Sequence, residues 1–307
     1  MYVIGMDGGG TKTSVLLADT NGKMLEEFTG GTINYNGGSK EFIDSNLKNI
    51  FHIITERGYH TEQCAAICTG AAGISNPTVK EQLLDNIRKA GYRCPVSIVG
   101  DMDTAFAGAL ESQEGIILIS GTGSICMGRD SKGNSYRTGG YGHLIDDVGS
   151  GYAIAREILS AVVKSSDGRK GGTLLKQLVF EYLSIGSLEE LIAYVYAPNR
   201  NKKEIAELSV LIEKAAKDRD MEAERIIEDC VLDLVELTVP VIRQWKEAPV
   251  LAVSGSVLLH NDFIYDKFCE GMQKLCPGIT VMKAKKSAVY GAMLLALKLC
   301  GNNRTVS

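Results

Sequence analysis

The amino-acid sequence predicts an α/β protein with a duplicated architecture: two lobes, each ordered βββ-α-β-α-β-α around a mixed sheet, with a helical insertion in the second lobe. One observation behind this prediction is an internal repeat, in which turn residues recur after a constant offset of 111 positions. The other is that apolar strands alternate with amphipathic helices after each copy. The repeated pairs are Gly10-Thr11 and Gly121-Thr122, Thr13 and Ser124, Asp19 and Asp130, and Gly22 and Gly133.

The start of each copy predicts a three-strand meander. An apolar run, 3–6 in the first copy and 116–119 in the second, leads into a glycine-threonine turn and a second extended run. An Asp-x-x-Gly tetrapeptide, beginning at Asp19 or Asp130, then precedes a third run. Asp at the first position and Gly at the fourth favour a type I turn, so each copy is expected to form consecutive antiparallel strands.

Helices and strands alternate through the rest of the first lobe. Apolar residues at helical spacing predict a helix over 39–55. A second helix is predicted over 77–90, because Asn76 is a favoured cap and Pro77 suits the first turn. Gly91 then favours its termination. The remaining predicted elements are strands over 65–69 and 96–99 and a helix over 102–110.

The second lobe carries the helical insertion, over about 150–246, before its own strand–helix–strand–helix series. Strand–helix–strand units impose parallel pairing and the meander supplies antiparallel pairing, so each sheet is expected to be mixed. The predicted domains are 1–112 and 113–307, and the last helix is a candidate to pack back on the N-terminal lobe. A cleft between two such lobes would be a common place for a ligand. The closing elements are strands over 250–254 and 279–282 and helices over 258–275 and 288–299.

Composition excludes several classes of partner. Of the 307 residues, 45% are hydrophobic and 23% charged, and the net charge is −4 without a block of like charges. Nucleic acid or an anionic membrane would favour a basic face, so neither is expected as a partner. No run approaches the roughly 18 apolar residues of a membrane span, and the N-terminus lacks signal-peptide features. We therefore expect a cytoplasmic protein.

The eight cysteines and four histidines show no metal-ligand spacing, and no C-x-x-C pair occurs. Most cysteines have apolar neighbours, so buried reduced thiols are favoured over a zinc or iron–sulfur site.

Two glycine-rich turns, over 8–13 and 120–124, occupy equivalent places in the repeat and predict phosphate binding. Glycine lets backbone N–H groups turn toward an anion, and nearby hydroxyls add donors. Neither turn has the spacing of a Walker motif or of a dinucleotide fingerprint, and a single glycine hairpin would be weak evidence. The candidate residues are Gly9, Gly10, Thr11, Lys12, Thr13, Gly121, Thr122, Gly123 and Ser124.

Three stretches resemble nucleotide-binding motifs of the actin-like ATPase superfamily, which includes sugar kinases and heat-shock chaperones. Residues 6–13 and 119–124 look like its two phosphate motifs, and 252–257 looks like its adenosine motif. Residues 139–151 are similar to a signature of the BadF/BadG/BcrA/BcrD-type ATPase branch, close to the N-acetylglucosamine and murein sugar kinases. The resemblance covers nearly the whole chain and implies a duplicated ribonuclease H-like, actin-like ATPase fold.

One segment departs from that signature. The family usually shows Gly-Asp-Glu-Gly-Ser where this sequence has Asp146-Asp147-Val148-Gly149-Ser150. Asp147 is retained, but no contact of the missing glutamate carries over to Val148. The substrate preference of this loop is therefore not implied by the resemblance.

The resemblance implies ATP and Mg²⁺ as cofactors and assigns the chemistry to carboxylates. Asp101 matches the catalytic aspartate, which would accept the proton of the acceptor hydroxyl. An aspartate there could instead cap the helix, and Asp103 is the backup candidate. Asp7 is expected to hold Mg²⁺ through water, although a hairpin aspartate can also accept backbone N–H bonds.

The adenosine and sugar contacts are also carried over from the family. Gly255 and Ser256 match adenosine contacts. Tyr290-Gly291-Ala292 is a second possible base contact or, equally, a small-residue packing seam. His143 is also compatible with a purely structural role. The candidate substrate residues are Asn34, Asn36, Gly70, Ala71, Asp101, Gly121, Thr122, Tyr141, His143 and Asp147.

The favoured function is therefore a kinase that transfers the γ-phosphoryl group of ATP to the 6-hydroxyl of N-acetylglucosamine or N-acetylmuramic acid, in cell-wall sugar salvage. Free glucosamine is a third substrate choice, and a homodimer is expected from relatives. One alternative is an ATPase that activates a 2-hydroxyacyl-CoA dehydratase or benzoyl-CoA reductase through an iron–sulfur cluster. Cys126 has no nearby second cysteine to support that function. A sugar-sensing regulator without turnover is a third possibility.

Overall fold

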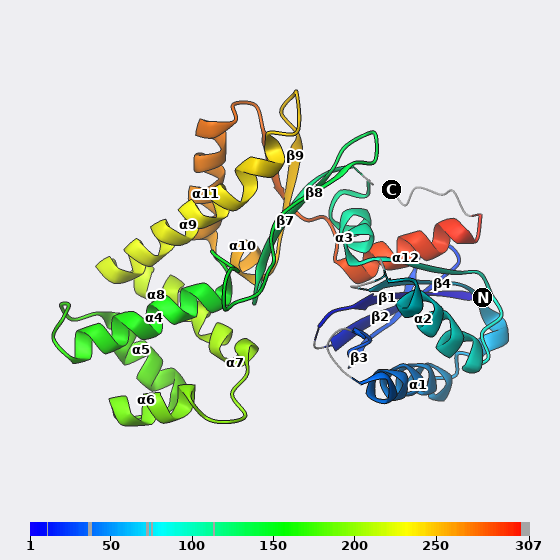
Figure 1. Ribbon diagram of the computed structural model, residues 1–307, viewed down its shortest axis with the longest axis horizontal. Helices are drawn as coiled ribbons and strands as arrows, with labels where there is room; N and C mark the ends of the chain where they lie inside the picture. The colour runs from blue at the N-terminus through cyan, green and yellow to red at the C-terminus, as the bar shows by residue number, and fades with distance from the viewer. Residues whose placement is uncertain (11, 36–38, 72–73, 75, 113, 302–307) are drawn as a thin grey trace. The chain divides into compact units, whose positions relative to one another are not determined.

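The computed structural model describes residues 1–10, 12–35, 39–71, 74, 76–112 and 114–301. The chain divides into two compact units, shown in Figure 1. Unit 1 comprises Met1–Gln113 and Ala284–Ser307, and unit 2 comprises Glu114–Lys283. The C-terminal helix thus belongs to the unit that contains the N-terminus.

Unit 1 contains a five-stranded mixed sheet with the strand order β3-β2-β1-β4-β5. The first three strands form an antiparallel meander, while β4 pairs in parallel with β1 and β5. The strands are β1 (Tyr2–Gly8), β2 (Lys12–Asp19), β3 (Met24–Gly31), β4 (Cys64–Ala71) and β5 (Val96–Gly100).

Helices cover both faces of this sheet (Figure 1). One face packs against α1 (Lys40–Glu56) and α2 (Pro77–Lys89), and the other packs against α12 (Ala288–Leu299). Alternate side chains of β1 point to opposite faces: Ile4 joins the first apolar cluster and Val3 the second. A strand buried on both faces is apolar at almost every position, which explains the continuous run at the N-terminus.

Small residues let α12 approach the rest of unit 1 closely. A Cβ on Gly5 of β1 would overlap the backbone of Met293. A Cβ on Gly291 would overlap the backbone of α3 (Asp101–Leu110), including the Thr104 carbonyl. Gly291 and Ala292 are buried in this contact, so Tyr290-Gly291-Ala292 contributes to a packing seam.

Unit 2 repeats the same topology in the order β10-β9-β6-β7-β8. Its meander is again antiparallel, and β9 pairs in parallel with β6 and β10. The predicted fold class, a duplicated α/β fold with mixed sheets, is confirmed. The strands are β6 (Gly115–Ser120), β7 (Ser124–Arg129), β8 (Ser135–Gly139), β9 (Val250–Ser254) and β10 (Thr280–Lys283).

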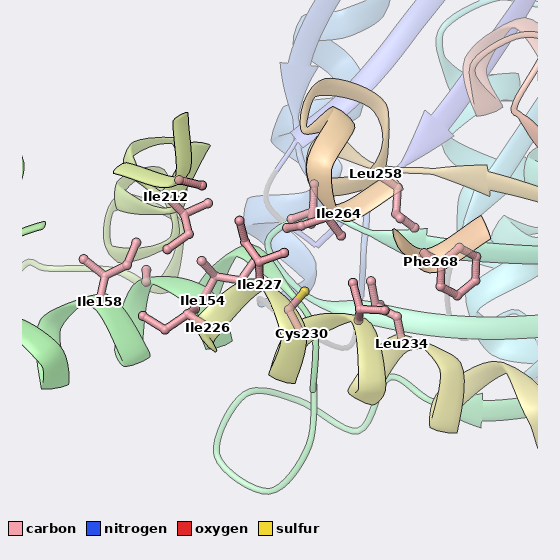
Figure 2. Packing of buried hydrophobic residues seen from close by; sticks show 14 of the residues in the cluster. Ile154, Ile158, Ile212, Ile226, Ile227, Cys230, Leu234, Leu258, Ile264 and Phe268 are labelled. Carbon is pink, nitrogen blue, oxygen red and sulfur yellow. The ribbon is translucent and has the colours of Figure 1, made fainter. Parts of the chain in front are cut away.

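The insertion is helical, as predicted, and it encloses the apolar core shown in Figure 2. Side chains from α4, α9 and α11 meet there, among them Ile158, Ile226 and Phe268. The helical segments of the insertion are α4 (Gly151–Ser166), α5 (Leu174–Leu183), α6 (Leu188–Val195), α7 (Lys202–Ala206), a 3-10 turn (Glu207–Val210), α8 (Leu211–Lys217) and α9 (Met221–Ile242). The helices α10 (Ser256–His260) and α11 (Asp262–Leu275) follow β9.

The single helix predicted over 258–275 is wrong, because the chain breaks at Asn261 between α10 and α11. The Asn261 side chain accepts a hydrogen bond from the Ile264 N–H at 3.0 Å, so this residue caps α11. A short 3-10 turn, Thr61–Gln63, precedes β4 and was not predicted.

All eight cysteines are free thiols, four of them buried and the other four half-buried. No helix in the described ranges combines the length and apolar character needed to cross a bilayer.

Candidate active site

The first glycine loop connects β1 to β2 and is held by its own backbone. The Gly9 N–H donates to the Lys12 carbonyl at 3.0 Å, and the Thr32 hydroxyl donates to the Gly9 carbonyl at 2.8 Å. Gly10 and Lys12 are exposed, whereas Thr13 is fully buried and donates its hydroxyl to the Gly31 carbonyl. The Thr13 hydroxyl therefore anchors β2 to β3. Thr11 lies outside the described residues.

Asp7 lies near the end of β1, in register with Ser14 of β2 and Gly70 of β4. The Thr104 hydroxyl donates to its Oδ1 at 3.2 Å. Burial raises the pKa of Asp7 to about 6, and the neighbouring charge of Asp101 acts in the same direction. Within the described part of the chain, no lysine or arginine forms an ion pair with Asp7. An unpaired, largely buried carboxylate is a group that a divalent cation would stabilise.

The donor set fits magnesium in particular. Among the described residues, no three His, Cys, Asp or Glu side chains form a metal-binding group. Mg²⁺ does not need such a cage, because it commonly uses one or two carboxylates, substrate phosphates and several waters.

Asp101 is the first residue of α3, and its side chain is exposed. Gly100 is the N-cap residue, and the Asp103 carboxylate accepts a hydrogen bond from the Gly100 N–H at 2.9 Å. Asp103 therefore supports the helix start. Asp101 Oδ1 accepts a hydrogen bond from the adjacent Met102 N–H, at 2.9 Å. The alternative in which Asp101 is the helix cap is wrong.

Parallel pairing brings the ends of β1, β4 and β5 together at one edge of the sheet in unit 1. Gly8 is in register with Ala71, which is in register with Gly100. Gly70 and Ala71 are the last residues of β4, so they lie within the strand instead of following it. A Cβ on Gly70 would come within 2.5 Å of the Thr104 side chain, so this glycine lets α3 approach the strand ends.

The candidate sugar residue Asn34 follows β3. Its N–H donates to the Thr32 hydroxyl at 3.1 Å, and Asn46 donates to the Thr32 carbonyl at 2.9 Å. These contacts fix the backbone next to the first glycine loop. Asn36 lies outside the described residues.

In unit 2 the second glycine loop, between β6 and β7, is fastened to the segment 147–151. The Gly151 N–H donates to the Gly121 carbonyl at 2.7 Å, and the Gly121 N–H donates to the Gly123 carbonyl at 2.9 Å. Ser120 donates its hydroxyl to the Gly149 carbonyl at 2.7 Å. Thr122 is exposed at the tip of the loop.

Ser124 is buried and donates its hydroxyl to the Val148 carbonyl at 2.5 Å. The segment 147–151 thus contacts the loop through main-chain atoms. The hydrogen bond from Ser124 uses the Val148 carbonyl and so does not depend on the Val148 side chain.

Asp147 is 4% exposed and has a left-handed backbone, with φ 59°. Its Oδ2 is 2.5 Å from Nζ of Lys202, the first residue of α7. A Cβ on Gly123 would come within 2.9 Å of the same carboxylate oxygen. Asp147 and Lys202 thus form an ion pair directly beside the second glycine loop.

Lys202 was missed by sequence reasoning. It stands 55 positions after Asp147, in the stretch Asn201-Lys202-Lys203-Glu204, which reads as an ordinary solvated helix start. No local signal in the sequence distinguishes it from Lys203.

Tyr141 and His143 contact residues other than this ion pair. Tyr141 is 65% exposed beneath the guanidinium of Arg137, 4.9 Å from its ring centroid. His143 packs edge-on against Tyr152 at 4.8 Å between ring centroids. The ring contact of His143 agrees with the structural role that the sequence left open.

Gly255 and Ser256 connect β9 to α10 beside the second loop. Gly255 has φ 87°, and a Cβ there would overlap the Ser120 carbonyl. Ser256 borders a cavity of about 230 Å³. That is smaller than the roughly 300–1,000 Å³ of pockets for drug-sized ligands, so it could enclose a fragment such as a planar base. Other lining residues are Ile154, Val210, Glu213, His260 and Ile264.

The chain was compared with known families, curated proteins and solved structures. Residues 4–296 match the model of the BadF/BadG/BcrA/BcrD ATPase family. The chain is 36% identical over 303 residues to an N-acetylmuramic acid/N-acetylglucosamine kinase from Clostridium acetobutylicum, covering 97% of this chain and 99% of that protein. It is 29% identical to the N-acetyl-D-glucosamine kinase of Dictyostelium discoideum, covering 96% and 97% of the two chains.

Solved structures share the fold. A protein from Porphyromonas gingivalis, proposed to be an N-acetylglucosamine kinase, superposes with a TM-score of 0.77 at 20% identity, covering 99% of this chain and 100% of that one. A ROK family glucokinase from Streptomyces griseus has a TM-score of 0.59 at 18% identity, covering 97% and 100%. Taken with the family match over nearly its whole length, these findings establish that the chain belongs to the BadF/BadG/BcrA/BcrD ATPase family.

Proposed function

We propose that this chain is an ATP-dependent sugar kinase that transfers the γ-phosphoryl group to the 6-hydroxyl of an N-acetylated amino sugar, N-acetylglucosamine or N-acetylmuramic acid. The structural observation that carries the proposal is a pair of carboxylates at one edge of the sheet in unit 1: Asp7 near the end of β1 and Asp101 directly after β5. Support for the sugar class comes from the 36% identical relative, which is a kinase named for both sugars.

Asp101 is proposed as the group that accepts the proton of the sugar hydroxyl. Its carboxylate is exposed, and one of its oxygens accepts a hydrogen bond from the Met102 N–H. Because Asp103 supports the helix start, Asp101 can approach a substrate without unfastening α3. A positioned carboxylate of this kind is a suitable general base.

Asp7 is proposed to hold Mg²⁺ through water. Bound magnesium supplies neutralisation of the phosphate charge during transfer. A nearby cation stabilises the Asp7 carboxyl group in its ionised form. Because the pKa of Asp7 is raised to about 6, that form predominates at pH above about 6. Thr104 orients it by donating to Oδ1.

Backbone N–H groups of the two glycine loops are proposed to bind phosphate oxygens. The hydroxyls of Thr13 and Ser124 hold the loops in shape, since both donate to main-chain carbonyls. We propose Thr122 as the hydroxyl donor of the second loop, because it is exposed at the tip. The cavity at Ser256 is proposed for part of the adenosine.

The function is tested by measuring ADP release with Mg-ATP in the presence of different sugars. N-acetylglucosamine and N-acetylmuramic acid should stimulate release more than glucosamine, glucose or N-acetylmannosamine. Mass spectrometry of the product checks the position of phosphorylation. The control acceptor is the 6-deoxy analogue of each sugar, which lacks the 6-hydroxyl and should not be phosphorylated. The absence of stimulation by every sugar would refute the kinase.

We further propose that the chain forms a homodimer through the helical insertion. Tyr182, Ile192 and Tyr196 are large apolar or aromatic side chains that are about half exposed or more on consecutive helical segments. Exposed apolar groups in one region favour protein contacts. Light scattering at micromolar concentration should give the mass of a dimer.

A further inference from the structure

The Asp147–Lys202 ion pair lies directly beside the second glycine loop, and the backbone of Asp147 is left-handed. That conformation strains most residues other than glycine. The pair is also largely removed from water, and a buried ion pair is weak evidence of a contribution to stability. Strain and desolvation at one position, directly beside the second glycine loop, indicate a role in binding.

The ammonium group of Lys202 has donors to spare. It carries three N–H groups, and the one contact it makes in the described part of the chain is to Asp147 Oδ2. The Asp147 side chain is only 5% exposed, but that of Lys202 is 29% exposed, so the solvent-accessible side of the pair is the cationic one. A ligand that reaches this pair therefore meets N–H donors with positive charge.

The charge balance favours a single carboxylate as the ligand group. The pair is neutral overall, so it offers little net attraction to a multiply charged triphosphate. Two free N–H donors on a cation nevertheless suit one carboxylate, which accepts charge-assisted hydrogen bonds. The neighbouring Val148 carries no charge, and the Asp146 carboxylate accepts a hydrogen bond from the Tyr141 N–H at 2.9 Å.

Only one of the two proposed sugars carries such a group. N-acetylmuramic acid is N-acetylglucosamine with a lactyl ether, and the lactyl group ends in a carboxylate that is ionised at neutral pH. We propose that Lys202 is a specificity-determining residue that binds this carboxylate, with Asp147 positioning its ammonium group. This inference rests on the proposed function, because it concerns the sugar that the kinase accepts.

The test compares catalytic efficiency toward the two sugars in matched variants. Lys202→Gln keeps a donor for Asp147 but removes the charge. It should lower the ratio of kcat/KM for N-acetylmuramic acid to that for N-acetylglucosamine by about tenfold or more, the scale for a lost charged partner. Lys202→Arg should recover much of the ratio. Lys203→Gln, the adjacent exposed lysine on the same helix, should leave it unchanged.

A second arm changes the substrate, and its first comparison uses only the unaltered protein. The methyl ester of N-acetylmuramic acid has one more methyl group than the acid and carries no charge. The unaltered protein should use the acid about tenfold more efficiently than the ester, whereas Lys202→Gln should not distinguish them. Together the four measurements form a cycle that isolates the contact between the ammonium and the carboxylate.

Several outcomes would overturn the inference. One is an unchanged sugar ratio in Lys202→Gln; another is an equal loss for both sugars with a raised KM for ATP, which would assign Lys202 to the nucleotide. Phosphorylation of N-acetylglucosamine but not N-acetylmuramic acid would refute the inference and leave the kinase function standing. If no sugar stimulated ADP release, the proposed function itself would fail.

Discussion

Two aspartates at the same edge of the sheet in unit 1 have different surroundings, and the difference separates their proposed roles. Asp7 is largely buried and accepts one side-chain hydrogen bond, so its pKa is raised to about 6. Asp101 is exposed on the first turn of α3. Environments that separate two carboxylates in this way are typical of sites where one binds a cation and the other transfers a proton.

Substitution of Asp101 tests the proton acceptor. Asp101→Asn should bind ATP and sugar nearly as before but lower kcat at least about a hundredfold, the usual scale for loss of acid–base catalysis. Asp103→Asn is the matched control: it keeps an oxygen for the Gly100 N–H and should change kcat by only a few-fold. Steady-state kinetics with isothermal titration of ATP separate binding from turnover. The reverse ranking of the two variants would make Asp103 the base.

Substitution of Asp7 should raise stability while abolishing activity. The carboxyl pKa is about 6 in the folded chain and 3.8 in the reference state, so ionisation opposes folding as pH rises between these values. Asp7→Asn removes that cost and keeps an acceptor for Thr104. Without Mg²⁺, the gain at pH 7.5 should be at most about 3 kcal/mol, equivalent to roughly two pK units.

Thermal unfolding of both proteins across pH, in EDTA, checks this expectation. The melting temperature of Asp7→Asn should exceed that of the unaltered chain at pH 7.5, and the two should converge near pH 4. A lower melting temperature at pH 7.5 would show that the Asp7 carboxylate stabilises the fold, contrary to its raised pKa.

At the scale of elements, the contact between α12 and α3 supports the active-site edge of unit 1. Gly291 of α12 abuts the α3 backbone at Thr104, and the Thr104 side chain reaches Asp7. Displacement of α3 would therefore move both Asp101 and the partner of Asp7. This packing seam thus supports the positions of the proposed catalytic groups, although Gly291 is distant from both of them in the sequence.

Replacing helix glycines by alanine tests this seam. Alanine normally stabilises a helix interior by about 1 kcal/mol relative to glycine. Gly291→Ala should instead destabilise the chain, by about 2 kcal/mol or more, and lower kcat, because the new Cβ overlaps main-chain atoms that cannot rotate away.

Gly271→Ala in α11 is the control, since its Cβ would meet only the Val235 side chain at 3.3 Å. It should be neutral or stabilising and leave kcat unchanged. Chemical denaturation and kinetics of the two variants give both quantities. Equal behaviour of the two would remove the steric argument for the seam.

At the scale of the whole molecule, the chain leaves unit 1, builds unit 2 and returns for the last helix. Unit 2 is continuous and has its own apolar core (Figure 2). Unit 1 is discontinuous, because Val289 and Met293 of α12 complete the cluster around Val3 and Leu16.

Isolated fragments of the two units should differ in whether they fold alone. A fragment of residues 114–283 should fold alone and melt cooperatively. A fragment of residues 1–113 should bind hydrophobic dyes, since one sheet face is uncovered, and fusing residues 284–301 to it through a flexible linker should restore folding. Circular dichroism and dye fluorescence check each fragment. A well-folded 1–113 fragment would show that α12 is dispensable for unit 1.

The sequence by itself determined the duplication, the order of strands and helices and the placement of Asp7 and Asp101 at strand ends. These properties follow from apolar periodicity and turn residues. Both act over a few positions and can therefore be recognised in the sequence. Even the break at Asn261 carried a local signal, since asparagine followed by aspartate is a favoured helix start, although the apolar pattern concealed it.

Only the tertiary structure decided how the polar groups are used. In the structure, Asp103 supports the start of α3 and Asp101 stays exposed. The hydroxyls of Thr13 and Ser124 donate to main-chain carbonyls. Lys202 forms an ion pair with Asp147. Each of these depends on where a side chain points after distant segments have packed. Because such contacts carry no periodicity in the sequence, the same residues could have been solvated with no change in any local pattern.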